Sequence, residues 1–512
     1  LALLARSRTT VSFAFVLPAR DRRSRRLAAL VTVIALVGVI PYVALQYKAV
    51  AMSLAVLSGQ EGGHVGVAAD PALYVALLMA LFAALFGTRQ VDATEHHHGM
   101  MLAIALESLV KLVAMVAVGV FAWMWLGGHD LRIVDTARTL FEEAPSTGFI
   151  AQTLLGFLAI VCLPRQFQVA VVECGDVADI RKARWLFSGY LLLTSVMVVP
   201  IAAAGVALFG NAGSVASDTF VLALPLAEGR EALALAAYIG GFSAATGMVI
   251  VASIALATMV SNDLVMPVLL RRGWAERHAA GDLASLVLWV RRVAILLLSL
   301  CAYGYHRWAG GDTLAAYGLM AFAAVAQFAP GLIGGLYWRG ASRRGVELGL
   351  LAGFATWFYT LLLPAMSASG LFDPAWMHDG PFGVHWLRPQ QLFGLSGWDP
   401  LTHGTFWSLL LNAAVMMLVS ARWRPSVDER LRIAPFLDPY VERQVLAPGE
   451  WPGNVSVGDL QALAIRIVGE RHARRAFSEQ AIALGRELQP AAAADRAWVQ
   501  FSERLIAASI GA

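Results

Sequence analysis

Charged residues are scarce in this chain of 512 residues: they make up 14%, against about 25% in soluble proteins. Hydrophobic residues make up 58%. A soluble globule built from this composition would have too few charged side chains to cover its surface. The composition therefore predicts a membrane protein that crosses the bilayer many times.

Catalytic and metal-binding motifs are also missing. The sequence contains no GxxxxGK[ST] phosphate loop, no GxSxG nucleophile elbow and no HExxH zinc motif, so an ATP-driven pump or a membrane hydrolase has no support in residues 1–512. Cys162, Cys174 and Cys301 form no CxxC pair and are interpreted as small packing residues. We predict no catalytic site, no metal site and no cofactor in this segment other than a candidate sodium ion.

Ten predominantly apolar runs are long enough for a hydrocarbon core of about 30 Å. They cover residues 27–50, 71–87, 100–126, 147–163, 185–209, 232–264, 286–303, 314–338, 346–366 and 403–420. With both ends in the cytoplasm, thirteen Lys and Arg residues fall in inside loops and five in outside loops, which is the asymmetry that membrane insertion favours. The same rule explains the basic net charge of +4, so nucleic acid is not expected as a partner.

Residues 162–185 are predicted to leave the membrane as a cytoplasmic loop. Pro164 would end the fourth run, and four basic residues follow, namely Arg165, Arg181, Lys182 and Arg184. Clustered Lys and Arg resist translocation. This loop therefore sets the orientation of the neighbouring spans.

The chain is predicted to have three parts. Residues 1–26 are an irregular segment that does not read as a signal peptide and is interpreted as the start of a fragment. Residues 27–421 form the transmembrane domain, and residues 422–512 form a cytoplasmic linker and the start of an amphipathic helical connector. In the connector, Ser456–Asp459 is predicted to cap a helical stretch. Its apolar face is predicted to contain Leu460, Leu463 and Ile467 and to continue through Phe477, Ile482 and Leu484, and Asp495 is predicted to cap a second helix.

Polar and helix-breaking residues inside the apolar runs are the candidates for function. Proline and glycine, as at Pro41 and Pro200, either kink a span or serve close packing. Ser243 and Thr246 lie one helical turn apart and would either help bind a cation or pack against a neighbouring helix. Glu107 and Lys111 have the i,i+4 spacing of an ion pair and are interpreted as orienting their helix.

Three stretches carry a resemblance to a known family: CLPRQFQVAVVECGDVADIRKARWLFSGY, GTRQVDATEHHHGMMLAIALESLVKLVA and SAATGMVIVASIALATMVSNDLVMPVLLR. They resemble the sodium:solute symporter family, and more closely the symporter-like sensor half of bacterial hybrid histidine kinases. The resemblance implies an all-α bundle of the leucine-transporter inverted-repeat type, with about ten of thirteen spans present. It places the protein in the bacterial inner membrane.

The resemblance also implies site residues. Tyr42 and Pro164 match positions around the substrate, while Gly156 and Ile160 replace an aromatic pair. For the ion, Gly247 and Met248 stand where the family has an adjacent Ser-Thr pair. The ion-binding set is therefore expected among Ser243, Thr246, Gly247 and Met248, with sodium coupling in question.

The implied function is a membrane nutrient sensor. It would bind or transport a small amino or organic acid and relay its state to downstream kinase domains or a response regulator, which would use ATP and magnesium. The alternatives are a stand-alone sodium/solute symporter and a receptor that no longer transports. The resemblance further implies that residues 1–512 alone do not transport, because three front spans are missing.

Overall fold

The chain forms two compact units, Leu1–Trp423 and Arg424–Ala512. The computed structural model describes residues 25–59, 66–87, 98–129, 131, 148–174, 177–210, 215–271, 280–309, 313–338, 340–368, 377, 379–424, 455–468, 470–495, 497–499, 501–502 and 505. Within these residues the only β-pairing is an isolated bridge between Ser456 and Ala493. The protein is all-α.

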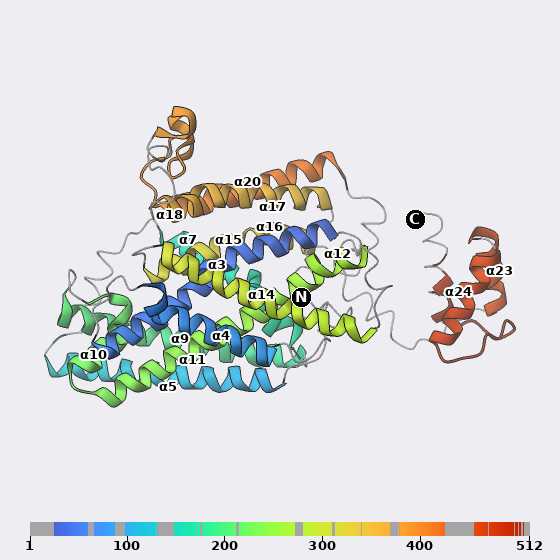
Figure 1. The fold of residues 1–512 in the computed structure, drawn as a ribbon. Helices are drawn as coiled ribbons and strands as arrows, with labels where there is room; N and C mark the ends of the chain where they lie inside the picture. Colours follow the sequence, from blue (N-terminus) through green and yellow to red (C-terminus); the bar gives the residue numbers. More distant parts are fainter. Residues whose placement is uncertain are drawn as a thin grey trace. The chain divides into compact units, whose positions relative to one another are not determined.

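In the first unit, helices coincide with all ten predicted apolar runs (Figure 1). Among the described residues, eight helices are long and apolar enough to cross a membrane, or nine if one bent pair counts as a span. The bounds are α3 (Arg25–Ser58), α4 (Pro71–Gly87), α5 (His98–Gly128), α7 (Phe149–Cys162), α8 (Pro164–Phe167), α9 (Val177–Phe209), α11 (Glu231–Met259), α14 (Ala280–Trp308), α15 (Leu314–Ala326), α16 (Phe328–Tyr337), α17 (Arg343–Trp357) and α20 (Pro400–Arg422). Helices satisfy their own backbone groups, which a hydrocarbon environment requires. The chain is a polytopic membrane protein.

The helix α3 lies at the centre of the main core and packs against α15, α14 and α11. Gly38 permits the approach of α15, because a Cβ there would lie 2.7 Å from the Cβ of Ala324. On one side of the bundle, α5 packs against both α9 and α11, and on the other side α17 and α20 run together (Figure 1). The small residues of these helices let their backbones come close, which is how helices associate in lipid.

Two of the proline positions considered as kinks do not interrupt their helices. Pro41 lies inside α3 and Pro200 lies inside α9. Between α15 and α16 the helix is interrupted at Gln327, three residues before Pro330. Gln327 is held there by its side chain, which donates to Ser408 of α20 at 2.9 Å.

The predicted cytoplasmic loop at residues 162–185 is largely helical. After Pro164 the chain continues through α8 into a π-helical turn, η2 (Gln168–Val172), and α9 already begins at Val177. Arg181, Lys182 and Arg184 therefore lie in the first turns of α9. The prediction of a loop was wrong because clustered basic residues mark where a chain leaves the membrane, whereas helices commonly extend beyond it.

The second unit contains α23 (Val457–Val468) and α24 (Glu470–Ala483). As predicted, Ser456 and Asp459 cap α23: the Ser456 backbone N–H and hydroxyl donate to Oδ2 of Asp459 at 2.9 and 2.7 Å. Asp495 caps the following turn by accepting from the backbone N–H of Trp498 at 3.1 Å. The core of this unit contains Phe477 and Trp498, whose rings stack at 5.5 Å.

The predicted apolar face of this unit is partly wrong. Leu460 and Leu484 pack against the core, but Leu463 is 47% and Ile482 is 78% exposed. The reason is that α23 and α24 pack against each other rather than presenting one continuous face.

Candidate functional site

A membrane helix is interrupted between α7 and α8, and the two segments are bent by 47°. Leu163 is extended, with φ −68° and ψ 125°, which is the conformation that proline imposes on the residue before it. Pro164 has no N–H, so the carbonyl of Ile160 loses its usual helical donor. The π-helical turn η2 follows directly, and such turns are frequent at functional sites.

An ion pair lies beside this interruption. Nζ of Lys111 lies 2.7 Å from Oε1 of Glu107, and the two side chains are 20% and 13% exposed. Since α5 begins at His98, a rise of 1.5 Å per residue places Glu107 about 14 Å along this helix. The pair therefore lies away from the end of α5, and its low exposure shows that the surrounding chain covers most of it.

Glycine at position 247 makes room for the ion pair. A Cβ on Gly247 of α11 would collide with the carboxylate of Glu107. At Gly240, two turns earlier, a Cβ would lie 2.7 Å from the Cβ of Ala114 of α5. These two glycines allow α11 and α5 to pack closely with the carboxylate held between them.

Arg165 is the second cation at this place. Its guanidinium lies over the ring of Tyr42, 5.7 Å from the centroid, and it interacts electrostatically with Glu107. Tyr42 is 5% exposed and, with α3 beginning at Arg25, lies about 26 Å along that helix. We refer to Tyr42, Glu107, Lys111, Arg165 and Gly247 as the helix-break site.

The four residues predicted around the substrate are only partly brought together. Tyr42 and Pro164 are buried, and Arg165 connects their surroundings. Ile160 is 48% exposed, and a Cβ on Gly156 would meet no atom within 4 Å. Gly156 and Ile160 thus do not share a buried wall with Tyr42.

The predicted ion-binding residues lie on α11. The Thr246 hydroxyl donates to the carbonyl of Phe242 at 2.6 Å, as the packing interpretation predicts, while its oxygen keeps lone pairs that a cation can use. Met248 packs against the main core, and Ser243 is partly buried. Gly247 is the member of this set that lies against a charged side chain, the carboxylate of Glu107.

Sequence reasoning found the Glu107–Lys111 pair but assigned it only an orienting role, and it placed Arg165 in a loop. The available signal was the rarity of ionisable residues inside apolar runs, which usually indicates function. The contact of Glu107 with Gly247 had no local signal, because 140 residues separate them along the chain.

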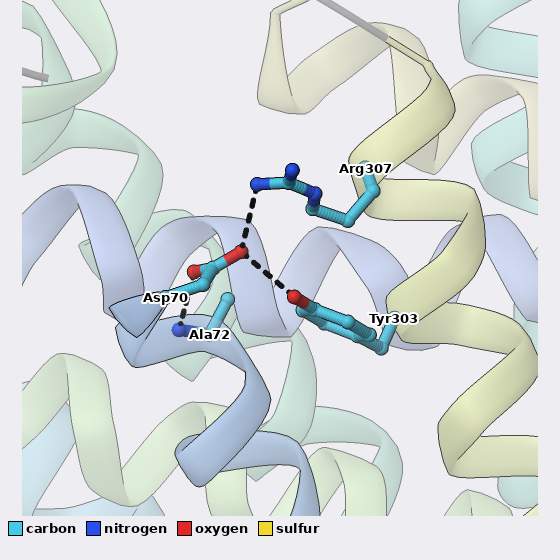
Figure 2. A network of polar contacts seen from close by, with 4 residues as sticks. All are labelled: Asp70, Ala72, Tyr303 and Arg307. Atoms are coloured by element: carbon cyan, nitrogen blue, oxygen red, sulfur yellow. Dashed lines mark hydrogen bonds and ion pairs between the residues drawn. The ribbon is translucent and has the colours of Figure 1, made fainter. Parts of the chain in front are cut away.

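A second polar network joins the start of α4 to the end of α14 (Figure 2). Oδ2 of Asp70 accepts from the Tyr303 hydroxyl at 3.0 Å and lies 3.4 Å from Nη1 of Arg307, while Oδ1 accepts from the backbone N–H of Ala72 at 2.9 Å. Asp70 is thus both a helix cap and an ion-pair partner. All of its oxygens are used, so this network fastens two helices.

A third polar contact lies in the continuation of α11, the π-helical turn η4 (Val260–Val265). There the hydroxyl of Thr32 donates to Oδ2 of Asp263 at 3.1 Å, and Asp263 is 7% exposed. Within the described residues, no group of three or more His, Cys, Asp and Glu side chains could hold a metal ion. The helix-break site remains the place where charges and an interrupted helix coincide.

No protein-family model matches the chain, and no curated protein sequence matches it significantly.

Proposed function

We propose that the membrane unit binds a small solute, an amino or organic acid, at the helix-break site, and that the C-terminal unit relays the state of that site to a downstream histidine kinase. The observation that carries this proposal is the interrupted helix directly beside intramembrane charges. Non-helical backbone at membrane depth persists only inside protein or beside a water-filled cavity. Ionisable residues there usually belong to solute or ion pathways.

The resemblance to the symporter-like sensors supports the same proposal. In the leucine-transporter inverted-repeat bundle that it implies, substrates bind where helices are broken near the middle of the bilayer. The separate second unit supports the signalling part, because a transporter alone has no need of it. We place the protein in the bacterial inner membrane with both ends of this segment in the cytoplasm, on the distribution of Lys and Arg.

The binding part is tested on the chain in lipid nanodiscs, with isothermal calorimetry against a panel of amino acids, organic acids, sugars and carboxamides. Saturable binding of at least one amino or organic acid is expected. A panel in which none of these acids binds would contradict the proposal. The signalling part predicts that the natural reading frame continues beyond Ala512 into a phosphoacceptor histidine and an ATP-binding domain, and a frame that stops there would reject it.

A stand-alone sodium/solute symporter is the second candidate. The observation that favours it is the Glu107 carboxylate beside Gly247, one residue from the Thr246 hydroxyl, because hard cations take such oxygen ligands. Uptake into vesicles by the full-length natural protein, with and without a sodium gradient, separates the two candidates. Uptake that requires the gradient and is lost in Thr246→Ala would favour the symporter.

A further inference from the structure

The helix-break site contains more positive than negative charge. Glu107 is bonded by Lys111 at 2.7 Å, so its negative charge is already neutralised. Among the described residues, the guanidinium of Arg165 interacts with the ring of Tyr42 and, at longer range, with the negative charge of Glu107. The next carboxylate along this segment, Glu173, accepts from Gln168 at 3.4 Å. Among the described residues, one positive charge of the site therefore has no carboxylate of its own.

An uncompensated cation at this depth is unfavourable. Arg165 is a partly buried residue of α8, and its side chain lies over the buried ring of Tyr42. Intramembrane Arg residues normally pair with an anion or with backbone carbonyls because the low dielectric penalises an isolated charge. Cation–π contact with Tyr42 compensates only part of that penalty. An anion bound beside the guanidinium would supply the compensation that is missing.

We propose that Arg165 is the residue that binds the carboxylate of the solute, with Tyr42 holding the guanidinium in place. The proposal rests on the solute-binding function above. It assigns a specificity role to a residue outside the set expected from the sequence. The Glu107–Lys111 pair in the same site adds no net charge, so the five residues of the site together carry one positive charge.

The charge balance selects the class of anion. A single residual positive charge is neutralised by a monovalent group, whereas a phosphate would leave an excess negative charge beside Glu107. The planar guanidinium also matches a carboxylate with two parallel hydrogen bonds. A small monocarboxylate fits both requirements.

The test compares paired ligands on the chain in nanodiscs by isothermal calorimetry. The probes are acetate, pyruvate, L-alanine and L-glutamine, the carboxamides of these acids, sodium chloride and inorganic phosphate. Wild type should bind at least one carboxylate more tightly than its carboxamide. Arg165→Gln should weaken binding of the carboxylate by about 10- to 150-fold, which corresponds to the loss of a charge-assisted hydrogen bond, and should leave the affinity for the carboxamide unchanged. The carboxylate affinity of Arg165→Lys should lie between those of wild type and Arg165→Gln, because a lysine keeps the charge but loses the paired hydrogen bonds.

Stability without ligand provides the second readout. If Arg165 carries an uncompensated charge, Arg165→Gln should melt at or above the wild-type temperature in ligand-free nanodiscs. A lower melting temperature would mean that Arg165 pairs with a group of the protein itself. Arg181→Gln, an exposed arginine of α9, is the matched control and should bind as wild type does. Equal affinity for carboxylate and carboxamide, or tighter binding of chloride or phosphate, would overturn the assignment while leaving solute binding itself intact. Absence of binding by every probe and by the wider solute panel would reject both.

Discussion

The contact between Gly247 and Glu107 makes glycine necessary at this position of α11. In Gly247→Ala the new Cβ would displace the carboxylate and loosen the ion pair. We expect a lower melting temperature and weaker solute binding. Gly241→Ala is the matched control on the same helix, because a Cβ there meets no atom within 4 Å; it should stabilise the protein by up to about 1 kcal/mol through helix propensity. Equal effects of the two substitutions would contradict the contact.

Lys111→Met should be costly because it removes the ion-pair partner of Glu107 and leaves that carboxylate with only the longer-range attraction of Arg165. For buried pairs the loss is about 3–5 kcal/mol, and the partial exposure of this pair places it near the lower end. Replacing both residues, as Glu107→Gln with Lys111→Met, should recover most of the stability. Thermal unfolding in nanodiscs measures both.

The control for this substitution is a pair of the same i,i+4 geometry in water. Arg474 and Glu470 lie 2.8 Å apart, with side chains 68% and 64% exposed. Arg474→Ala should cost only about 0.3–0.5 kcal/mol. If Lys111→Met cost as little stability as Arg474→Ala, the Glu107–Lys111 pair would not be shielded from water.

Contacts between residues close together in the sequence were predictable, whereas contacts between distant residues were not. The i,i+4 spacing of Glu107 and Lys111 and the Ser456–Asp459 cap are local patterns, and both contacts are present. The contact of Arg165 with Tyr42 joins two helices more than a hundred residues apart, and only tertiary packing brings them together.

The interruption between α7 and α8 should depend on Pro164. Pro164→Ala restores an N–H that can donate to the carbonyl of Ile160, so the two segments should straighten and move Arg165 away from Tyr42. Spin labels at the exposed residues Leu154 and Ala170 should then lie farther apart by double electron–electron resonance. We expect solute binding to fall. Pro200→Ala, inside the uninterrupted α9, is the control and should leave binding unchanged.

The cap of α23 should give the second unit a pH dependence. Hydrogen bonds from the backbone and hydroxyl of Ser456 lower the pKa of Asp459. A carboxyl whose folded pKa is lowered stabilises the fold above its unfolded pKa, about 3.9, and this contribution disappears as the pH falls through the lower folded value. Exchange protection of the Ser456 amide should therefore decrease below about pH 4.

Asp459→Asn provides the comparison for this pH dependence. The amide keeps an acceptor oxygen but has no charge to titrate, so its protection should not change over the same pH range once intrinsic exchange rates are divided out. Identical profiles for wild type and Asp459→Asn would show that Asp459 does not contribute.

At the scale of elements, helix existence was more predictable than helix ends. The ten apolar runs coincide with helices, because hydrophobic length follows directly from bilayer thickness. The start of α9 was missed, since Arg181, Lys182 and Arg184 are compatible with helix and mark only the approach of water. The packing of α23 against α24 was also missed, because the helical periodicity of the sequence continues from one helix to the other.

For the molecule as a whole, composition alone indicated a polytopic membrane protein, and the structure has eight or nine candidate spans among its described residues. Of the ten predicted spans, α4 is shorter than the helices that qualify as candidate spans, and its start is fastened by Asp70. Composition could not indicate which helix would be interrupted or which charges would meet there. Those features follow from how the helices pack.

If the C-terminal unit relays the state of the helix-break site, a bound solute changes the state of that unit. Hydrogen–deuterium exchange of the chain in nanodiscs, with and without a saturating solute from the panel, measures this coupling. We expect slower exchange in residues 164–172 together with altered exchange in residues 455–502. Saturable solute binding without any change in residues 164–172 would contradict the proposed site, and protection confined to the membrane unit would contradict the relay.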